Sequence, residues 1–184
     1  MNYYGAKDLA DGLRTVRKNT LIIAEEIPED RYGFRAAPET RTVAHILTHI
    51  AVGQRMPEQI HAIERRTTLE AFDFPGLMRS IVAEEQRPRS KAQIIALLRD
   101  EGERWAKWLE SQSDDFLAER VKFPAGMTPP SKTRFEMLLS TKEHEMHHRG
   151  QLMVMQRMLG MTPHLTRQMQ ERMARQAAQA AATR

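Results

Sequence analysis

The segment from His144 to Gln151 has the sequence His-Glu-Met-His-His-Arg-Gly-Gln, and its histidines point most directly to chemistry. His144 and His148 lie four residues apart, so in a helix they share one face and stand about 6 Å apart along the axis. Imidazole nitrogens placed in this way can bind the same divalent cation. The spacing therefore predicts a metal site that takes a third ligand from another segment.

The predicted third ligand is His49, in the helical segment 43–50. It lies at the edge of an apolar stripe, and Gly53 on the same side would allow a second helix to approach closely. His45 sits one turn earlier and is the competing candidate, which we expect instead to be capped or on the surface. We therefore predict that His49 and the pair described above form a three-histidine site for a divalent metal.

Apolar residues flank the pair, namely Met137, Leu152 and Met155. The two imidazoles are therefore not expected to be simply solvated, and a buried pair without a metal would need other hydrogen-bond partners for its ring nitrogens. Gln151 lies one turn further along the same face. It is either an outer partner of the site or an amide at the edge of the core, and the sequence favours neither.

The other histidines and the intervening glutamate are predicted to lie outside the site. His147 points about 100° away from His148. His61 and His164 have no partner in the sequence and are predicted to lie on the surface. Glu145 is turned by about 100° from the nearest histidine of the pair, and we expect a solvated charge there.

The residues from His144 to His148 also match the His-Glu-x-x-His motif of zincin proteases, in which the glutamate is the general base. The extended form of that motif needs glycine where this chain has Gln151, and a third ligand would have to be Glu171 in the tail. Zincins also present a substrate-binding strand, and no strand signal is found in this sequence. A metalloprotease is therefore the weaker alternative.

The composition is that of a soluble globular protein. The 184 residues suffice for one domain with a sizeable core, and 41% of them are hydrophobic and 28% charged. The chain has no cysteine, which excludes disulfides, thiolate metal sites and a cysteine nucleophile. Metal binding must therefore use histidines and carboxylates, and any thiol chemistry needs a small-molecule thiol.

The net charge of +4 comes from basic residues mixed with acidic ones along the chain. No basic stripe with interleaved aromatic residues is present, so nucleic-acid binding is not expected. No apolar run approaches the roughly 20 residues of a membrane span, and residues 1–8 lack the features of a signal peptide. We expect a cytoplasmic protein with no membrane anchor.

Helical periodicity predicts four long helices, over residues 6–27, 40–65, 90–110 and 133–159. Capping boxes at Ser90 and Thr133 begin the third and fourth, and Pro57 predicts a kink near Met56 in the second.

Between the second and third helices runs a long connection, residues 66–89. Its length favours a crossover or a functional lid, with a short helix over 75–86. Segment 123–130 is predicted to be a loop, and no strands are expected. The fold class is therefore all-α: a four-helix bundle over residues 1–162 with a long crossover between helices 2 and 3. An Ala/Gln/Arg-rich tail over 163–184 is expected to be helical in part.

The fourth helix has apolar residues on two sides. Met137 and Met155 share the side of the histidine pair, whereas Phe135, Leu139, Met146 and Met153 lie opposite. A helix that is apolar on both sides is usually buried on both. The second side is expected to meet another helix or a second subunit, and we predict a homodimer.

Segments 27–35, 38–50 and 143–152 resemble, in order and separation, those of the DinB-like family, which includes YfiT-type metal-dependent hydrolases. The resemblance runs from about residue 6 to 162. Its most specific parts are Leu-Thr-His-Ile in the second helix and His-x-x-x-His-Arg-Gly-Gln in the fourth.

This resemblance implies a four-helix bundle, often dimeric, with a site for nickel, zinc or a similar ion at His49, His144 and His148. For some members it also implies transfer or isomerisation reactions that use a small thiol as cosubstrate. Many other members have no established activity, and DNA binding is not implied.

Three protein ligands leave a coordination position open, as in catalytic zinc sites. Three functions therefore stay open: a metal-dependent hydrolase or small-thiol-dependent transferase, a non-catalytic metal-binding or interaction bundle, and a metalloprotease. Hydrolysis and thiol transfer need the same ligands, because a metal can activate either a water molecule or a thiol. The sequence does not specify the substrate.

Overall fold

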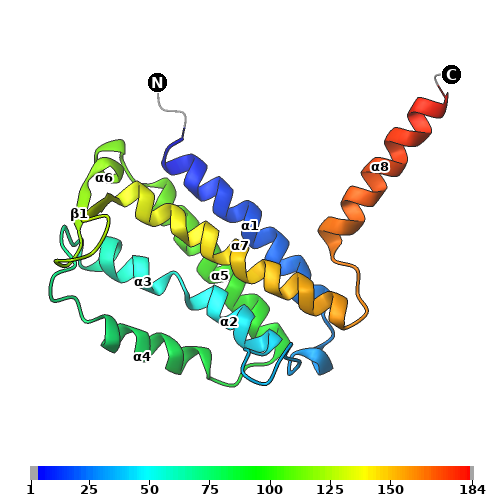
Figure 1. Cartoon of the computed structure of the whole chain (residues 1–184), viewed down its shortest axis with the longest axis horizontal. Coiled ribbons are helices and arrows are strands. Elements are labelled where there is room, and N and C mark those ends of the chain that lie inside the picture. The colour runs from blue at the N-terminus through cyan, green and yellow to red at the C-terminus, as the bar shows by residue number, and fades with distance from the viewer. Residues whose placement is uncertain (1–3, 183–184) are drawn as a thin grey trace.

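Four helices form the body of the protein in the computed structural model, which describes residues 4–182. They are α1 (Ala6–Glu26), α2 (Val43–Val52), α5 (Lys91–Glu110) and α7 (Arg134–Met158). Both α1 and α2 pack against α5 and α7, so the four run side by side (Figure 1). The predicted all-α four-helix bundle is confirmed.

Shorter elements connect and extend the bundle. They are the 3-10 helix η1 (Glu29–Arg31), α3 (Arg55–Pro57), the π-helical turn η2 (Glu58–Ile63), α4 (Phe74–Glu85), α6 (Asp114–Ala118), β1 (Arg120–Lys122), β2 (Ser131–Thr133) and α8 (His164–Ala182). No helix in residues 4–182 has both the length and the apolar character to cross a bilayer.

Helix starts follow the capping residues of the sequence. The Thr42 side chain accepts a hydrogen bond from the backbone N–H of His45 at the start of α2. Ser90 and Thr133 form capping boxes with Gln93 and Glu136, which confirms both predictions. The last of these fixes where α7 begins and so which of its residues share a face.

The second predicted helix breaks earlier than expected. It stops at Val52, turns through Gly53 and Gln54, and resumes as α3 and η2, which end at Ile63. Pro57 explains the position, because its ring clashes with the carbonyl four residues earlier, at Gly53, and it has no N–H to donate there.

The long crossover contains the predicted short helix. α4 begins after Asp73, whose side chain accepts from the backbone N–H of Gly76, and it carries Pro75 in its first turn. This helix packs along α2 (Figure 1). The crossover therefore places α4 beside α2, the helix that carries His49.

The expectation of no strands is wrong at one place. β1 and β2 pair antiparallel around the loop at 123–130, with Val121 opposite Lys132. Each strand has only three residues, too few to show a two-residue alternation in the sequence. Val121 is fully buried and anchors this hairpin in a small cluster with Ile60, Leu69 and Phe72.

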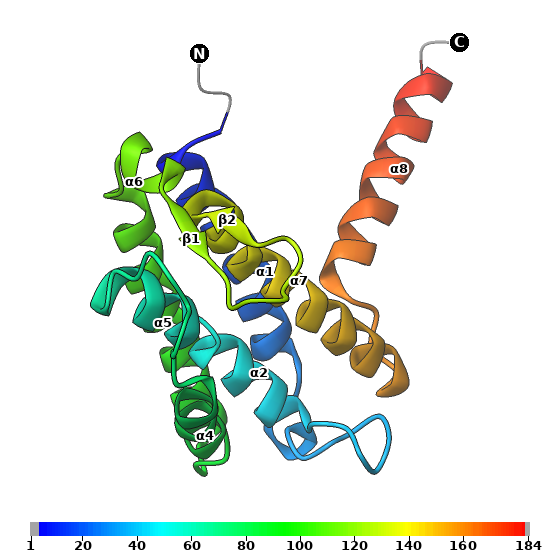
Figure 2. The ribbon, with the colours of Figure 1, turned by 60° about the vertical axis from the view of Figure 1, so that its left-hand side comes forward.

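The C-terminal tail is helical as far as the structure describes it. α8 runs from His164 to Ala182 and projects away from the bundle (Figures 1 and 2), while residues 183–184 of the predicted tail lie outside the described residues. The prediction that His164 is a surface residue is wrong. It is buried at the start of α8, where its Nε2 lies 3.1 Å from the Asn19 Oδ1 on α1.

His61 was also expected at the surface, and that prediction is wrong. Its side chain is only 1% exposed, and its Nδ1 accepts a hydrogen bond of 2.9 Å from the buried guanidinium of Arg134. This pair could not be predicted from local patterns, because 73 residues separate its members. Burial, together with the positive charge of Arg134, lowers the pKa of His61 to about 4.

This buried histidine makes stability depend on pH. Unfolded His61, with an ordinary pKa near 6.5, binds a proton below that pH while the folded protein does not until about pH 4. The free energy of unfolding should therefore fall by about 1–2 kcal/mol between pH 7.5 and pH 5 through this residue. Urea unfolding at both pH values, compared with His61→Gln, measures the difference, and an equal pH dependence in both proteins would contradict it.

Candidate metal centre

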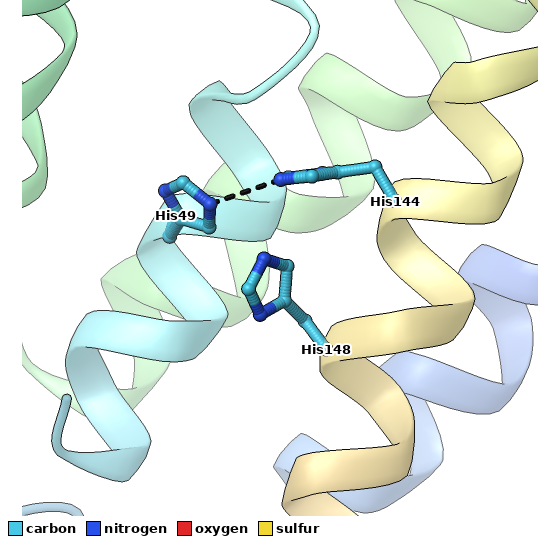
Figure 3. A group of neighbouring side chains, drawn as sticks. All are labelled: His49, His144 and His148. Atoms are coloured by element: carbon cyan, nitrogen blue, oxygen red, sulfur yellow. Dashed lines mark hydrogen bonds between the residues drawn. The ribbon is translucent and has the colours of Figure 1, made fainter. Parts of the chain in front are cut away.

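The three predicted histidines come together between two helices. His49 projects from α2, and His144 and His148 project from α7, with all three rings directed into the same space (Figure 3). Their ring centroids lie 4.6–4.8 Å apart in each of the three pairings. The structure thus brings together residues that are 95 positions apart in the chain.

The ring nitrogens converge closely. The Nε2 atoms of His49 and His144 lie 2.9 Å apart, and one nitrogen from each of the three rings falls within 4.8 Å of the others. Zinc binds imidazole nitrogen at about 2.0–2.1 Å, so two nitrogens on one ion stand roughly 3–4 Å apart. The group therefore has the spacing to hold one ion.

His49 is oriented by a carboxylate. Its Nδ1 donates to the Glu85 Oε2 at 3.0 Å, and Glu85 also accepts from the Arg41 guanidinium. Burial acts to raise the pKa of Glu85, but the hydrogen bonds from His49 and Arg41 outweigh it and lower the pKa to about 2. Because an ionised carboxylate only accepts, the proton of His49 sits on Nδ1 and the lone pair on Nε2 faces the other rings.

His148 is oriented by an amide. Its Nδ1 donates to the Gln151 Oε1 at 2.9 Å, which leaves Nε2 with its lone pair. The Gln151 Nε2 lies 3.2 Å from the Nε2 of His147, an exposed residue outside the three-histidine group. Of the two roles that the sequence left open for Gln151, the structure supports the outer partner of the site.

His144 is held between α7 and the turn after α2. A Cβ built on Gly53 would lie only 2.9 Å from the His144 Cε1, so a side chain there would displace the ring. This confirms the close approach predicted at Gly53. Burial, reinforced by the neighbouring histidines, lowers the pKa of His144 to about 4, and burial also lowers that of His148. At neutral pH both rings are therefore neutral, the form that binds metals.

The donor set fits a divalent metal. Two of the three histidines donate their ring N–H, on Nδ1, to an oxygen acceptor, and this arrangement fixes the tautomer of metal-binding histidines and raises their basicity. Nickel, copper and zinc all accept imidazole ligands. The three side chains could therefore hold such an ion with a coordination position left open.

The other candidates do not join the group. His45 is half-buried and lies outside the three-histidine group. Glu171, the third ligand required by the protease alternative, is an exposed residue of α8. The helix that carries it projects away from the bundle and from α7 (Figure 2).

The expectation of a solvated Glu145 is wrong. Its side chain is 2% exposed and accepts hydrogen bonds of 3.0 and 3.1 Å from Nε of the buried Arg17 on α1. Both carboxylate oxygens are therefore engaged by the Arg17 guanidinium. The structure therefore lends no support to Glu145 as a general base.

Glu85 is the site residue that the sequence reasoning missed. The available signal was indirect: a short helix in a long connection that was expected to form a crossover or lid, with an acidic pair at its end. Which of Glu84 and Glu85 meets a histidine depends on how α4 packs against α2.

We expect Glu85→Gln to weaken zinc binding by about 10–100-fold, the usual effect of replacing a carboxylate that orients a ligand histidine. Glu84→Gln is the matched control, because Glu84 pairs with arginines rather than with a histidine. Competition titrations against a chromophoric chelator measure both dissociation constants. Equal weakening in the two variants would refute the role of Glu85.

We expect Gly53→Ala to weaken zinc binding as well, because the new methyl group must push the His144 ring from its position. Gly150→Ala on α7 is the control: its Cβ meets nothing within 4 Å, and alanine favours helix by roughly 0.5–1 kcal/mol. Isothermal titration should show weaker binding for Gly53→Ala alone. Unchanged affinity would mean that the ring tolerates the displacement.

Comparisons with known proteins agree with this architecture. The family model of the DinB superfamily matches residues 13–152. A DinB-like protein of Bacillus subtilis is similar in structure, with 19% identity and a TM-score of 0.61 over 84% of this chain and 93% of that one. No curated protein matches the sequence.

Two further solved structures are similar. A DinB-like protein of Bacillus cereus has 17% identity and a TM-score of 0.65 over 88% of this chain and 97% of that one. The Sibling Lethal Factor Precursor DfsB has 15% identity and a TM-score of 0.63 over 88% of this chain and all of that one. At these identities the structures show a shared fold, and the family model covers most of the chain. The chain belongs to the DinB superfamily.

Proposed function

We propose that the protein holds one divalent metal ion, nickel or zinc, at His49, His144 and His148. The observation that carries this proposal is the convergence of three imidazoles from two helices, with the second nitrogens of His49 and His148 already bound to oxygen acceptors. A hydrogen bond from the non-coordinating ring nitrogen to an oxygen acceptor is characteristic of metal-binding histidines.

We further propose that the protein is a metal-dependent hydrolase or a small-thiol-dependent transferase. A divalent ion supplies Lewis acidity, which favours loss of a proton from a water molecule or a thiol. The chain contributes the geometry: Glu85 and Gln151 keep the protons of His49 and His148 on Nδ1, away from the centre. Since the chain has no cysteine, the thiol of a transferase must come from a cosubstrate.

The test is an activity screen of zinc-loaded and nickel-loaded protein. One arm offers esters and amides in water, and the other offers carbon electrophiles with and without glutathione. We expect turnover in one arm that is lost on chelation, restored by metal and absent in His144→Ala. Turnover that survives chelation would contradict the proposal.

A second candidate is a non-catalytic metal-binding or interaction bundle. It is favoured by three exposed apolar residues of α7, Met146, Val154 and Met158. Bound metal with no turnover in either arm of the screen would support it. The metalloprotease alternative loses its support with the burial of Glu145 against Arg17.

The exposed apolar residues of α7 also support our proposal of a homodimer. Of the predicted second stripe, Phe135, Leu139 and Met153 pack partly against the core of their own bundle, whereas Met146 remains exposed. If this proposal is wrong, size-exclusion chromatography with light scattering would show the monomer alone.

We also propose that the protein is cytoplasmic. We further propose that residues 1–162 form the bundle unit and that the tail at 163–184 is separate from it.

A further inference from the structure

Two cavities are lined by residues of the candidate metal centre or by their hydrogen-bond partners. One, which we call the α4 cavity, has a volume of about 340 Å³ and is lined by residues of α1, α2, α3, α4 and α7, among them His49 and His144. The other, of about 370 Å³, is lined by Arg41 and Gln151 but by none of the three histidines. Of these two cavities, the α4 cavity is the one lined by candidate ligand residues.

Apolar side chains form most of the wall of the α4 cavity away from the histidines. Ile50 comes from α2, Met56 from α3, and Met78 and Ile81 from α4. Methionine side chains are flexible and polarisable, so they adapt to ligands of different shape. A concave site with an apolar lining and a few polar groups is the usual form of a small-molecule site.

The charged groups of this wall neutralise each other. Arg17 and Glu145 both line the cavity, but they form the buried ion pair described above. Neither offers an uncompensated charge to a ligand. The Thr141 hydroxyl, also on this wall, is buried with no hydrogen-bond partner in the described part of the chain, so a polar ligand atom could satisfy it.

We propose that the α4 cavity binds the neutral, apolar group of a small substrate whose reactive polar group lies at the three histidines. This inference rests on the proposed metal site and adds the substrate class to it. The same helix that supplies Glu85 to His49 supplies Met78 and Ile81 to the cavity, so α4 joins substrate recognition to ligand orientation.

A homologous series of hydroxamates tests the proposal on zinc-loaded protein. Acetohydroxamate carries the metal-binding head group alone, while butano-, hexano- and octanohydroxamate add an unbranched apolar chain. Burial of each methylene contributes about 0.8 kcal/mol, so calorimetry should give up to about fourfold tighter binding per added methylene until the cavity is full. This readout does not depend on turnover.

Three glutamate substitutions test where the alkyl chain of the hydroxamates binds. Met78→Glu places a charge on the wall of the α4 cavity. Val82→Glu is the control, because Val82 lies one turn further along α4, is equally exposed at 37%, and does not line the cavity. Val154→Glu changes the other cavity. We expect Met78→Glu to remove most of the rise in affinity from acetohydroxamate to octanohydroxamate, whereas Val82→Glu and Val154→Glu should each keep that rise.

The outcomes separate this inference from the proposed function. If acetohydroxamate fails to bind the zinc-loaded wild type, the proposed open metal site falls and this inference falls with it. If all four hydroxamates bind equally, or if Val154→Glu removes the gain and Met78→Glu does not, the α4 cavity is not the apolar site while the metal centre stands.

Discussion

Glu145→Ala is expected to destabilise the folded protein by about 3–5 kcal/mol, because it leaves the buried guanidinium of Arg17 without its carboxylate. For a chain of this length the loss corresponds to a fall in Tm of roughly 6–20 °C. Thermal unfolding followed by circular dichroism measures it.

The size of this effect follows from the depth of the pair. Arg17 also donates to the backbone carbonyl of Leu98 and lies 3.4 Å from Gln54 Oε1, so its position is fixed from several sides. A Cβ on Gly102 would lie 2.5 Å from its Nη1, and glycine there makes room for the guanidinium. The charge therefore cannot simply move to water when its partner is removed.

Two controls distinguish the buried pair from a general effect of mutation. Glu143→Ala removes an exposed carboxylate of the same helix and should change stability by less than about 0.5 kcal/mol. The double variant Arg17→Met with Glu145→Leu removes both charges and should lose much less stability than the sum of the two single variants. Additive losses would show that the two residues do not act as a pair.

Most of the fold could be predicted from local patterns in the sequence. Apolar periodicity and the capping boxes at Ser90 and Thr133 depend on residues within one or two turns. They predicted α1, α5 and α7 closely but not the break at Val52 in the second helix. The spacing of His144 and His148 is local in the same sense. His49 could be placed beside them because it too lay on the inward edge of a periodic helix.

Pairings between distant polar residues could not be predicted in this way. Arg17 and Glu145 are 128 positions apart, and His49 and Glu85 are 36 apart on different helices. A charged residue on a helix is usually solvated, so its burial can be predicted only when its partner is known. The same reason explains the wrong surface assignments of His61 and His164, whose partners are Arg134 and Asn19.

The largest effect on the proposed site is expected from replacing its histidines. His144→Ala and His148→Ala each leave two imidazoles, and the chain has no cysteine that could substitute. We expect binding of zinc or nickel to fall by well over 100-fold in either variant, more than for Glu85→Gln, because a ligand is lost rather than its orientation. His49→Ala should behave in the same way, although His49 lies on the other helix.

Elemental analysis of purified protein, dialysed against buffer freed of metals, tests the three-imidazole centre most directly. We predict close to one nickel or zinc ion per chain in the wild type and in His45→Ala, whose histidine lies one turn from His49 but outside the group. His49→Ala, His144→Ala and His148→Ala should each retain almost none. Full occupancy in any of these three variants, or none in the wild type after incubation with metal, would contradict the account.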